Sequence, residues 1–322
     1  MLHITNGGSA VSVLSHAGIE GDILSWDDVL HEGPVRGELT PDERRRERAA
    51  FIASGGWADS AEQVDAAFRA RDARLAAALE SGEALTLWFE HDLYDQWQLL
   101  EVLVACAATA GTDVALELVL SSDYIGHFRP HDVHAAHVVR RAATAVDLAD
   151  AISAWQALTG ADPRAIDVAI AADTGALPHL RAALRRHAEE YPDTQGGLSR
   201  TERQLLEALA DGPRTLRTLF PATHQEREEA VFLGDTVFLS IVARLARATT
   251  PLVRAGAAGA DAARDAWART LELTDAGRGA LAGTFDHARA NRVVRWLGGV
   301  ALGSNAPDWR YDRHTQRLTL SP

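Results

Sequence analysis

Three ionisable side chains, Glu90, His91 and Asp92, stand directly between an apolar run and a helical pattern. The run at residues 84–89 predicts a buried strand, and the apolar periodicity after Asp92 predicts a helix. Carboxyl and imidazole groups are the usual general acids and bases of enzymes. In an open α/β sheet such a turn lies at the carboxyl end of a strand, where ligands bind. The stretch therefore predicts a site of proton transfer.

Three further strands are predicted at residues 2–5, 21–26 and 114–120, and polar residues follow each of them. If all four strands run parallel, their carboxyl ends lie on one rim of a sheet, and the polar groups converge there. This pattern predicts an α/β fold with a Rossmann-like, mostly parallel sheet. The expected catalytic residues are His31, Glu32, Glu90 and His91. The expected ligand-binding residues are Asn6, Gly7, Ser9, Asp92, Asp95, Gln96, Ser122 and Asp123.

These side chains suit chemistry on a small anionic substrate. His31 or His91 is expected as the general acid or base, because imidazole titrates near neutral pH. Glu90 would orient a histidine or act as the base itself, with a pKa that is raised if other elements close the rim. Asp92 could carry a divalent ion, so a divalent metal is left open as a cofactor.

Two of these groups also have a purely structural interpretation. Asn6, Gly7 and Ser9 could hold a phosphate or oxyanion on free backbone N–H groups. Alternatively, the glycines serve only to close a turn at residues 6–9, before a helix predicted at 10–17. Asp92 and Asp95 could simply cap the helix that follows them. The sequence alone leaves both alternatives open.

Four histidines follow the fourth strand at a spacing that suggests a metal tract. Pro130 interrupts the pattern, and no carboxylate completes a known zinc motif, so metal binding is not predicted there. His3 fits either a hydrogen-bonded core position or a site position. The tract comprises His127, His131, His134 and His137.

A chain of 322 residues is too long for one ordinary core. We expect the Rossmann-like domain at residues 1–130, a helical connector at 131–195 and a winged-helix-like domain with a C-terminal hairpin at 196–322. Two charged, alanine-rich helices at 41–53 and 61–79 form a predicted insertion, residues 40–82, between the second and third strands. The charged run at 42–48 is typical of a solvated helix face.

Charge is distributed unevenly along the chain. Residues 1–197 hold 15 arginines against 31 acidic residues, residues 198–322 hold 17 against 14, and there is no lysine. The acidic part argues against a nucleic-acid surface there. Cys106 is the single cysteine, which excludes an intrachain disulfide. No apolar stretch is long enough for a membrane span and no export signal is visible, so we expect a cytoplasmic protein without a membrane partner.

Residues 198–273 show the order of a winged helix. Ser199 and Glu202 predict a capping box, a longer helix is expected at 235–247, and two short β-like stretches follow at 251–254 and 270–273. The longer helix would present Thr236, Ser240, Arg244 and Arg247 outward, which permits nucleic-acid binding through this region. A plain packing module fits the same pattern equally well.

The chain resembles a bacterial family called domain of unknown function 1835. The similar stretches are His3-Ile4 with Asn6-Gly7, residues 29–34 (VLHEGP) and residues 88–96 (WFEHDLYDQ). Residues 197–202 (GLSRTE) and 296–299 (WLGG) extend the resemblance over most of the chain. At Gly8 this chain departs from the family pattern, which has an acid there. The resemblance implies no activity and no site residues.

We expect an enzyme of hydrolase or phosphoryl-transfer type that acts on a small anionic, nucleotide-like substrate at the rim. The sequence contains neither a Ser-His-Asp motif nor an HExxH motif, either of which would indicate another mechanism. The alternatives are a DNA-binding transcriptional regulator with a ligand-sensing N-terminal domain, and a scaffold without chemistry. The sequence does not determine the substrate, the pathway or the oligomeric state.

Overall fold

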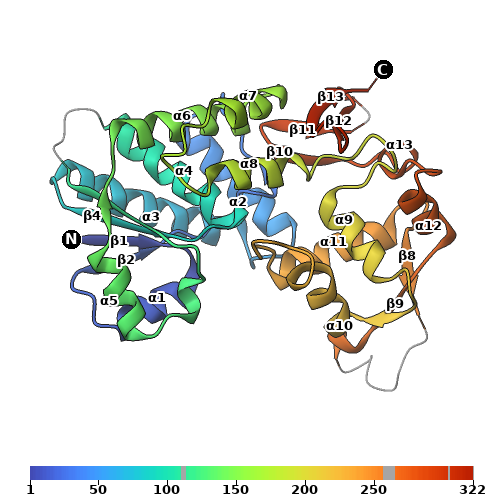
Figure 1. The fold of residues 1–322 in the computed structure, drawn as a ribbon, viewed down its shortest axis with the longest axis horizontal. Helices are drawn as coiled ribbons and strands as arrows, with labels where there is room; N and C mark the ends of the chain where they lie inside the picture. The colour runs from blue at the N-terminus through green and yellow to red at the C-terminus, as the bar shows by residue number, and fades with distance from the viewer. Residues whose placement is uncertain (110–113, 257–264, 304, 322) are drawn as a thin grey trace. The chain divides into compact units, whose positions relative to one another are not determined.

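A computed structural model describes residues 1–109, 114–256, 265–303 and 305–321 of the chain. Contacts divide the chain into two compact units (Figure 1). The first comprises Met1–Arg185 with Gly298–Val300, and the second Arg186–Leu297 with Ala301–Pro322. Residues 131–185, predicted to belong to a separate connector, therefore pack with the first unit. Among the described residues, no helix combines the length and the apolar character that crossing a membrane requires.

A five-stranded sheet forms the centre of the first unit, in the order β2-β1-β4-β5-β6. Strands β1, β2, β4 and β5 run parallel, so the parallel arrangement on which the predicted convergence depends is confirmed. The chain goes from β1 to β2 on one side and then crosses to β4 on the other side of β1. The carboxyl ends of β1 and β4 therefore flank the point where the strand order reverses. The strands of this unit are β1 Leu2–Thr5, β2 Asp22–Ser25, β3 Gly33–Pro34, β4 Leu85–Phe89, β5 Leu116–Leu120 and β6 Arg141–Ala142.

Helices cover both faces of this sheet: α1 and α5 lie below it in Figure 1, and α4 and α6 above it. Ala10 and Leu14 of α1 pack in a buried cluster with Trp88 of β4 and Val133 of α5. All five residues of β4 are buried, as an apolar run in a doubly covered parallel strand should be. The helices are α1 Gly7–His16, α4 Leu93–Ala108, α5 Pro130–Val138, α6 Ala145–Thr159, α7 Arg164–Ala172 and α8 Leu180–Ala188, with a 3₁₀ turn at Ile125–His127.

The predicted turn at residues 6–9 is wrong in one respect, because α1 already begins at Gly7, with Asn6 as its N-cap residue. Gly7 has a positive φ of 71°, a conformation that glycine adopts without a Cβ clash. The tight turn and the helix start are thus the same residues. His3 is fully buried and accepts a hydrogen bond from Trp88 Nε1 at 3.0 Å, so it is a hydrogen-bonded core residue.

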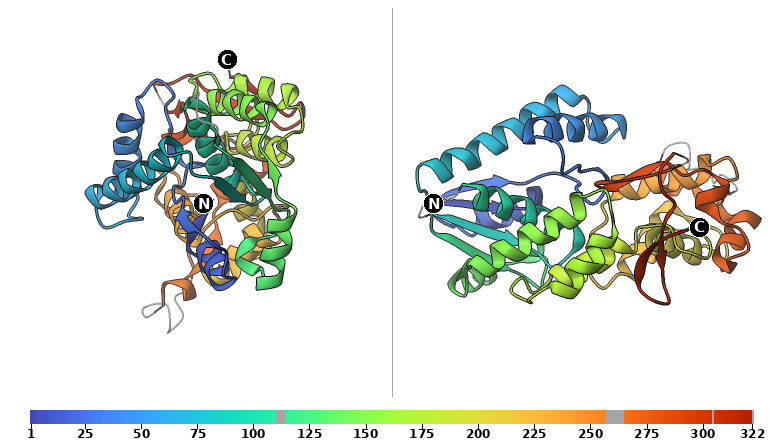
Figure 2. Two further views of the ribbon diagram at one scale, coloured as in Figure 1. Left: turned by 90° about the vertical axis from the view of Figure 1, so that its left-hand side faces the viewer. Right: turned by 90° about the horizontal axis from the view of Figure 1, so that it is seen from above.

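Helices α2 (Pro41–Ser54) and α3 (Ala61–Glu80) run beside each other outside the sheet (Figure 2). Thr40 and Glu43 form a capping box at the start of α2. Pro41 occupies the first helical position, where proline is favoured. The expectation that residues 42–48 are a solvated face is wrong at Arg45 and Arg48, which are 8% and 2% exposed. Both arginines are buried because each has a carboxylate partner.

Strand β6 was not predicted, and it explains Glu117 in the middle of β5. β6 pairs antiparallel with β5, so β5 is not the sheet edge. Arg140, directly before β6, donates a hydrogen bond from Nε to Glu117 Oε2 at 2.6 Å. Arg140 is therefore the local partner of Glu117.

The second unit combines short helices with small antiparallel sheets. β7, β9 and β8 form a three-stranded antiparallel sheet, and β12 pairs with β13 as a C-terminal hairpin. The capping box of Ser199 and Glu202 is confirmed. The helices are α9 Arg200–Ala208, α10 Leu216–Phe220, a π-turn at Pro221–Gln225, α11 Asp235–Arg247, a 3₁₀ turn at Ala266–Ala268, α12 Asp275–Ala282 and α13 His287–Ala290. The strands are β7 Arg214–Thr215, β8 Val253–Ala255, β9 Thr270–Leu273, β10 Arg295–Gly298, β11 Val300–Leu302, β12 Trp309–Asp312 and β13 Arg317–Leu320.

Candidate functional site

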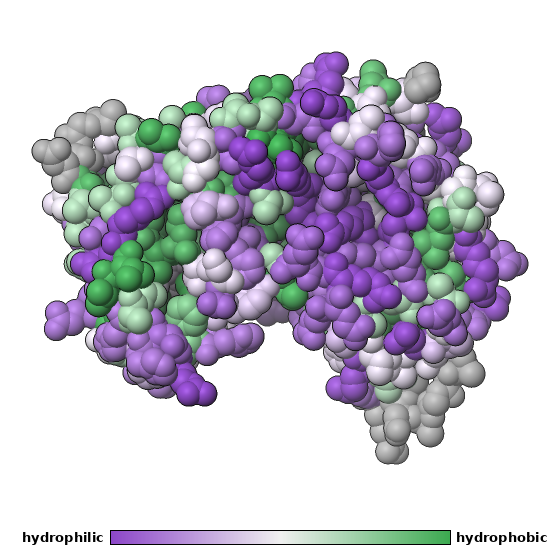
Figure 3. All heavy atoms as spheres, viewed as in Figure 1, coloured by the Kyte–Doolittle hydropathy of each residue, from purple (hydrophilic) through white to green (hydrophobic). Residues whose placement is uncertain are grey.

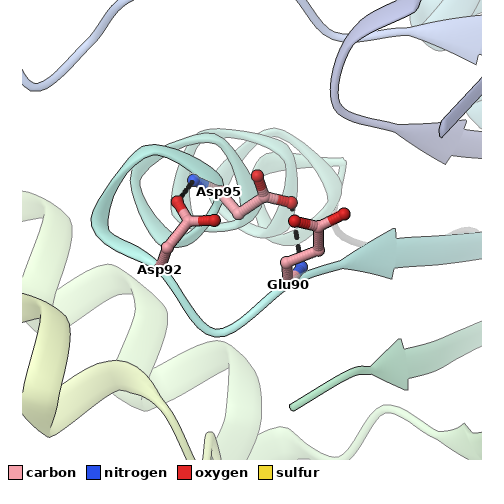
Figure 4. A group of neighbouring side chains, drawn as sticks. All are labelled: Glu90, Asp92 and Asp95. Atoms are coloured by element: carbon pink, nitrogen blue, oxygen red, sulfur yellow. Dashed lines mark hydrogen bonds between the residues drawn. The ribbon is translucent and has the colours of Figure 1, made fainter. Parts of the chain in front are cut away.

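Three carboxyl groups converge at the carboxyl end of β4. Glu90, Asp92 and Asp95, which we call the acidic cluster, each offer a carboxylate oxygen, and these oxygens lie within 4.8 Å of one another. Glu90 follows β4 directly, Asp92 is the N-cap of α4 and Asp95 lies in the first turn of that helix. Figure 4 shows the three side chains pointing toward one another.

The sequence folds this way because the two aspartates satisfy free backbone N–H groups at the helix start. Asp92 Oδ1 accepts hydrogen bonds from the backbone N–H groups of Tyr94 (2.8 Å) and Asp95 (3.1 Å). Asp95 Oδ1 accepts from the backbone N–H of Glu90 at 2.8 Å. The capping interpretation is therefore correct for Asp92, and Asp95 is the acid in the first turn of the helix. Both carboxyl groups lie at the rim.

The acidic cluster is tied to the strands on both sides of β4. Asn6, after β1, donates from Nδ2 to Asp95 Oδ2 at 2.5 Å. The backbone N–H of Ile125, in the segment after β5, donates to Glu90 Oε1 at 2.6 Å. Gln96 Nε2 donates to the carbonyl oxygen of Glu90 at 2.7 Å, so Gln96 positions the backbone of the cluster. The cluster thus sits where the strand order reverses.

Burial shifts all three carboxyl groups toward their neutral form. The pKa of Glu90 rises to about 7, because the group is buried and because the charge of Asp95 is close. Burial also raises the pKa of Asp95 to about 6, against the opposing hydrogen bonds from Glu90 N–H and Asn6. The pKa of Asp92 is raised by burial and by the charge of Asp95. Near neutral pH the cluster can therefore both take up and release a proton.

His91 faces the loop after β5 and packs against two rings. Its ring centroid lies 5.1 Å from Tyr124 and 5.9 Å from His179. Burial lowers the pKa of His91, against the opposing charge of Asp123, and burial also lowers the pKa of His179. Both imidazoles are therefore held toward the neutral state. Tyr124 and His179 were not predicted as site residues, and no local pattern marks His179, which precedes a helix far along the chain.

His31 and Glu32 are buried in the loop that follows β2, and are 3% and 7% exposed. His31 stacks edge-on against the ring of Tyr94, in the first turn of α4, with centroids 5.3 Å apart. The carbonyl oxygen of Glu32 accepts a hydrogen bond from Arg48 Nη1 at 2.6 Å. His31 thus approaches the helix that carries the acidic cluster, and Glu32 is held by α2.

The other predicted ligand-binding residues lie at the ends of β1 and β5. Ser9 is exposed in the first turn of α1, and a Cβ added at Gly126 would lie 3.3 Å from Ser9 Cβ. Ser122 and Asp123 are exposed in the loop after β5. Ser9 therefore lies beside the segment around Ile125, whose backbone N–H donates to Glu90. Ser122 and Asp123 lie on the side of His91, and the charge of Asp123 acts on that imidazole.

The histidine tract does not converge on one point. His137 stacks on Trp88 with centroids 5.7 Å apart, and His131 contacts the Asp132 carboxylate at 3.1 Å. Among the residues that the structure describes, the acidic cluster is the only group of histidine, cysteine or acidic side chains placed to hold a metal ion.

Comparison with known proteins adds no relative: no protein-family model and no curated protein matches the chain. The resemblance to domain of unknown function 1835 stays a prediction.

Proposed function

We propose that this protein is an enzyme that acts on a small anionic, nucleotide-like substrate at the acidic cluster, by hydrolysis or phosphoryl transfer. The observation that carries the proposal is the position of the cluster. Three carboxyl groups with raised pKa values, two of them buried and one half-buried, lie at the carboxyl end of β4, beside the reversal in strand order. Ligands of Rossmann-like and other open α/β sheets bind at such points.

Charge decides how an anionic substrate can bind there. The described residues place no arginine in hydrogen-bond contact with the three carboxyl groups, so the ionised cluster would repel a phosphate. A divalent cation held by Asp92 and Asp95 would offset their negative charge and would leave coordination positions for a phosphate. Mg²⁺ is typically bound by one or two carboxylates together with substrate phosphate oxygens. We therefore include a divalent cation in the proposal, with Asn6 fixing Asp95 in place.

Glu90 is the group best suited to move the proton. Its pKa of about 7 matches the working range of a general base at neutral pH. In a hydrolysis, the oxygen of water would bond to the phosphorus while Glu90 takes the water proton. The bond from phosphorus to the leaving oxygen would break, and that oxygen would receive the proton. In a transfer reaction a substrate hydroxyl replaces the water.

The cation requirement predicts a thermal shift. A ligand that binds only the folded chain raises its stability, by about 2.7 kcal/mol at a hundred times its Kd. At about pH 8, above the pKa values of Glu90 and Asp95, Mg²⁺ or Mn²⁺ should raise the melting temperature, and a nucleotide should raise it further.

Variants locate that effect. Asp92→Asn and Asp95→Asn should abolish the shift, whereas Glu62→Gln, at an exposed acid of α3, should leave it intact. Equal shifts in all four proteins would mean that the ion binds elsewhere, and no shift with any cation would remove the cation from the proposal.

A second function has a specific observation in its favour. The order α9, β7, α10, α11, β8, β9 with the sheet β7-β9-β8 fits a winged helix, a DNA-binding arrangement. The visible face of the second unit is mostly hydrophilic (Figure 3). Of the predicted outward residues of α11, Thr236 and Arg247 are exposed and Ser240 is half-buried. Arg244 is bonded to the buried Glu202 of α9 at 3.2 Å, and so it is occupied within the unit.

DNA binding would depend steeply on salt, because phosphate contacts release counterions. If the winged helix binds DNA, affinity falls as salt rises, and Arg247→Ala should make this dependence shallower. The magnitude of the slope of log affinity against log salt should decrease by about one. Arg244→Ala should leave that slope unchanged, because its charge already faces Glu202. Affinity that does not vary with salt would exclude this function.

A further inference from the structure

A second cavity lies in the first unit, away from the acidic cluster. It has a volume of about 320 Å³ and is enclosed by α2, α3, α4 and the rings of Trp26 and Trp155. This volume is in the range of small-molecule sites, which are mostly apolar with a few placed polar groups. None of its lining residues belongs to the acidic cluster. Glu101 lies six residues after Asp95 on α4, on the order of 9 Å along the helix.

Arg71 enters this cavity with one donor group unused. It is 8% exposed, and its guanidinium lies 3.9 Å from the Trp26 ring centroid and 4.6 Å from that of Phe68. Nε donates to Asp72 Oδ1 at 3.0 Å, and Nη2 lies 2.9 Å from the same oxygen and 3.8 Å from Glu101 Oε2. The buried Nη1 has no hydrogen-bond partner among the described residues. An unsatisfied buried donor is costly, so a ligand with an acceptor at this point would be stabilised by it.

Arg44 supplies a second cation to the same cavity. Its guanidinium lies 5.4 Å from the ring centroid of Trp155, and no carboxylate of the described residues forms an ion pair with it. The two other arginines of the lining are occupied: Arg48 pairs with Asp28 at 2.6 Å, and Arg45 with Asp42 at 2.6 Å. Arg71 also pairs with Asp72, at 2.9 Å, but its Nη1 group has no hydrogen-bond partner among the described residues. Arg44 and Arg71 Nη1 are therefore the cationic groups that an incoming anion would meet.

We propose that this cavity binds a small carboxylate with an aromatic or aliphatic body. The carboxylate accepts from Arg71 Nη1 and faces Arg44, because a guanidinium matches a carboxylate in charge and in planar geometry. The apolar body lies among Trp26, Phe68 and Trp155. The site is separate from the acidic cluster, and the proposal stands whether or not that cluster is catalytic.

Three acids line the cavity, and two of them pair with arginines: Asp28 with Arg48 and Asp72 with Arg71. Glu101 is the third acid that an incoming anion would approach. Its Oε2 accepts a hydrogen bond from Trp26 Nε1 at 2.8 Å, which fixes its position. Burial raises the pKa of Glu101, although Arg71 and Arg44 oppose that shift. Since burial disfavours its charge, the repulsion it exerts on the ligand is reduced.

The test uses two probes that share one body and differ in charge, 2-naphthoate and 2-naphthamide, titrated into the full chain by calorimetry. The naphthoate should bind saturably, and the naphthamide more weakly. Arg71→Met should weaken naphthoate binding roughly ten- to hundredfold, the worth of a charge-assisted hydrogen bond. It should change naphthamide binding little. Arg69→Met, at an exposed arginine of the same helix, is the matched control and should match the native chain.

Arg44→Met provides a second variant in case loss of Arg71 impairs folding. Arg44 is not fully buried and forms no ion pair among the described residues, so its replacement should spare the fold while it weakens naphthoate binding. The proposal is overturned if neither naphthoate nor octanoate binds at millimolar concentration. It is equally overturned if naphthoate and naphthamide bind alike, or if Arg44→Met and Arg69→Met behave the same.

Discussion

Replacing Glu90 with glutamine is expected to raise the free energy of unfolding of the metal-free protein by about 2–3 kcal/mol at about pH 8. The pKa of Glu90 is about 7 in the folded protein, against an ordinary value of 4.5. Below the ordinary value both states hold the proton, and the native chain and the variant should be equally stable. As the pH rises toward 7 the unfolded chain ionises first, and the native protein loses stability that glutamine retains.

Urea unfolding at a series of pH values measures this difference. Glu83→Gln is a control of opposite sign. Arg74 and the N-terminal amine hold the pKa of Glu83 below its usual range, so this variant should lose stability above about pH 4.5. If Glu90→Gln is no more stable than the native chain at high pH, Glu90 has an ordinary pKa and the argument for a general base fails.

Replacing Arg48 with methionine is expected to destabilise the protein by about 3–5 kcal/mol. Arg48 is 2% exposed and binds the buried Asp28 at 2.6 Å. It also donates to the carbonyl oxygens of Glu32 (2.6 Å), Val29 (2.9 Å) and Pro34 (3.3 Å). Its loss leaves a buried carboxylate and three carbonyl groups without this donor, and it releases the loop that carries His31.

Denaturant unfolding of the variant measures the loss. Arg46→Met, at an exposed position on the same helix, should stay within about 0.5 kcal/mol of the native protein. The double variant with Asp28→Leu should recover part of the loss, because the uncompensated charge is removed with its partner. A loss below about 1 kcal/mol in Arg48→Met would show that the loop is held by other contacts.

The four parallel strands of the first sheet could be predicted because their apolar runs are local patterns. The rim at Glu90 followed from them, since the carboxyl ends of parallel strands share one edge. The structural role of Asp92 and Asp95 could also be predicted, because aspartate is a preferred N-cap residue and an acid in the first turn is favoured by the helix dipole. What the sequence could not give is the bond from Asn6 to Asp95, which joins residues far apart in the chain.

The errors have one physical cause, since each depends on a partner distant in sequence. The local charge pattern predicts that Arg48 is solvated, because its buried partner Asp28 lies in another segment of the chain. Strand β6 is too short to carry a pattern, and it exists through its pairing with β5. His179 contacts the ring of His91 because the segment before α8 packs beside the end of β4, and no local pattern predicts that packing. Residues that hold a site in place are therefore harder to predict than those at the ends of strands.

The most direct test of the account is the titration of the Glu90 carboxyl group by carbon NMR, with the signal assigned by its loss in Glu90→Gln. Without a cation we expect a pKa of about 7. Saturating Mg²⁺ should lower it by favouring the ionised carboxylate. An ordinary pKa near 4.5 that does not respond to Mg²⁺ would contradict the proposed function of the acidic cluster.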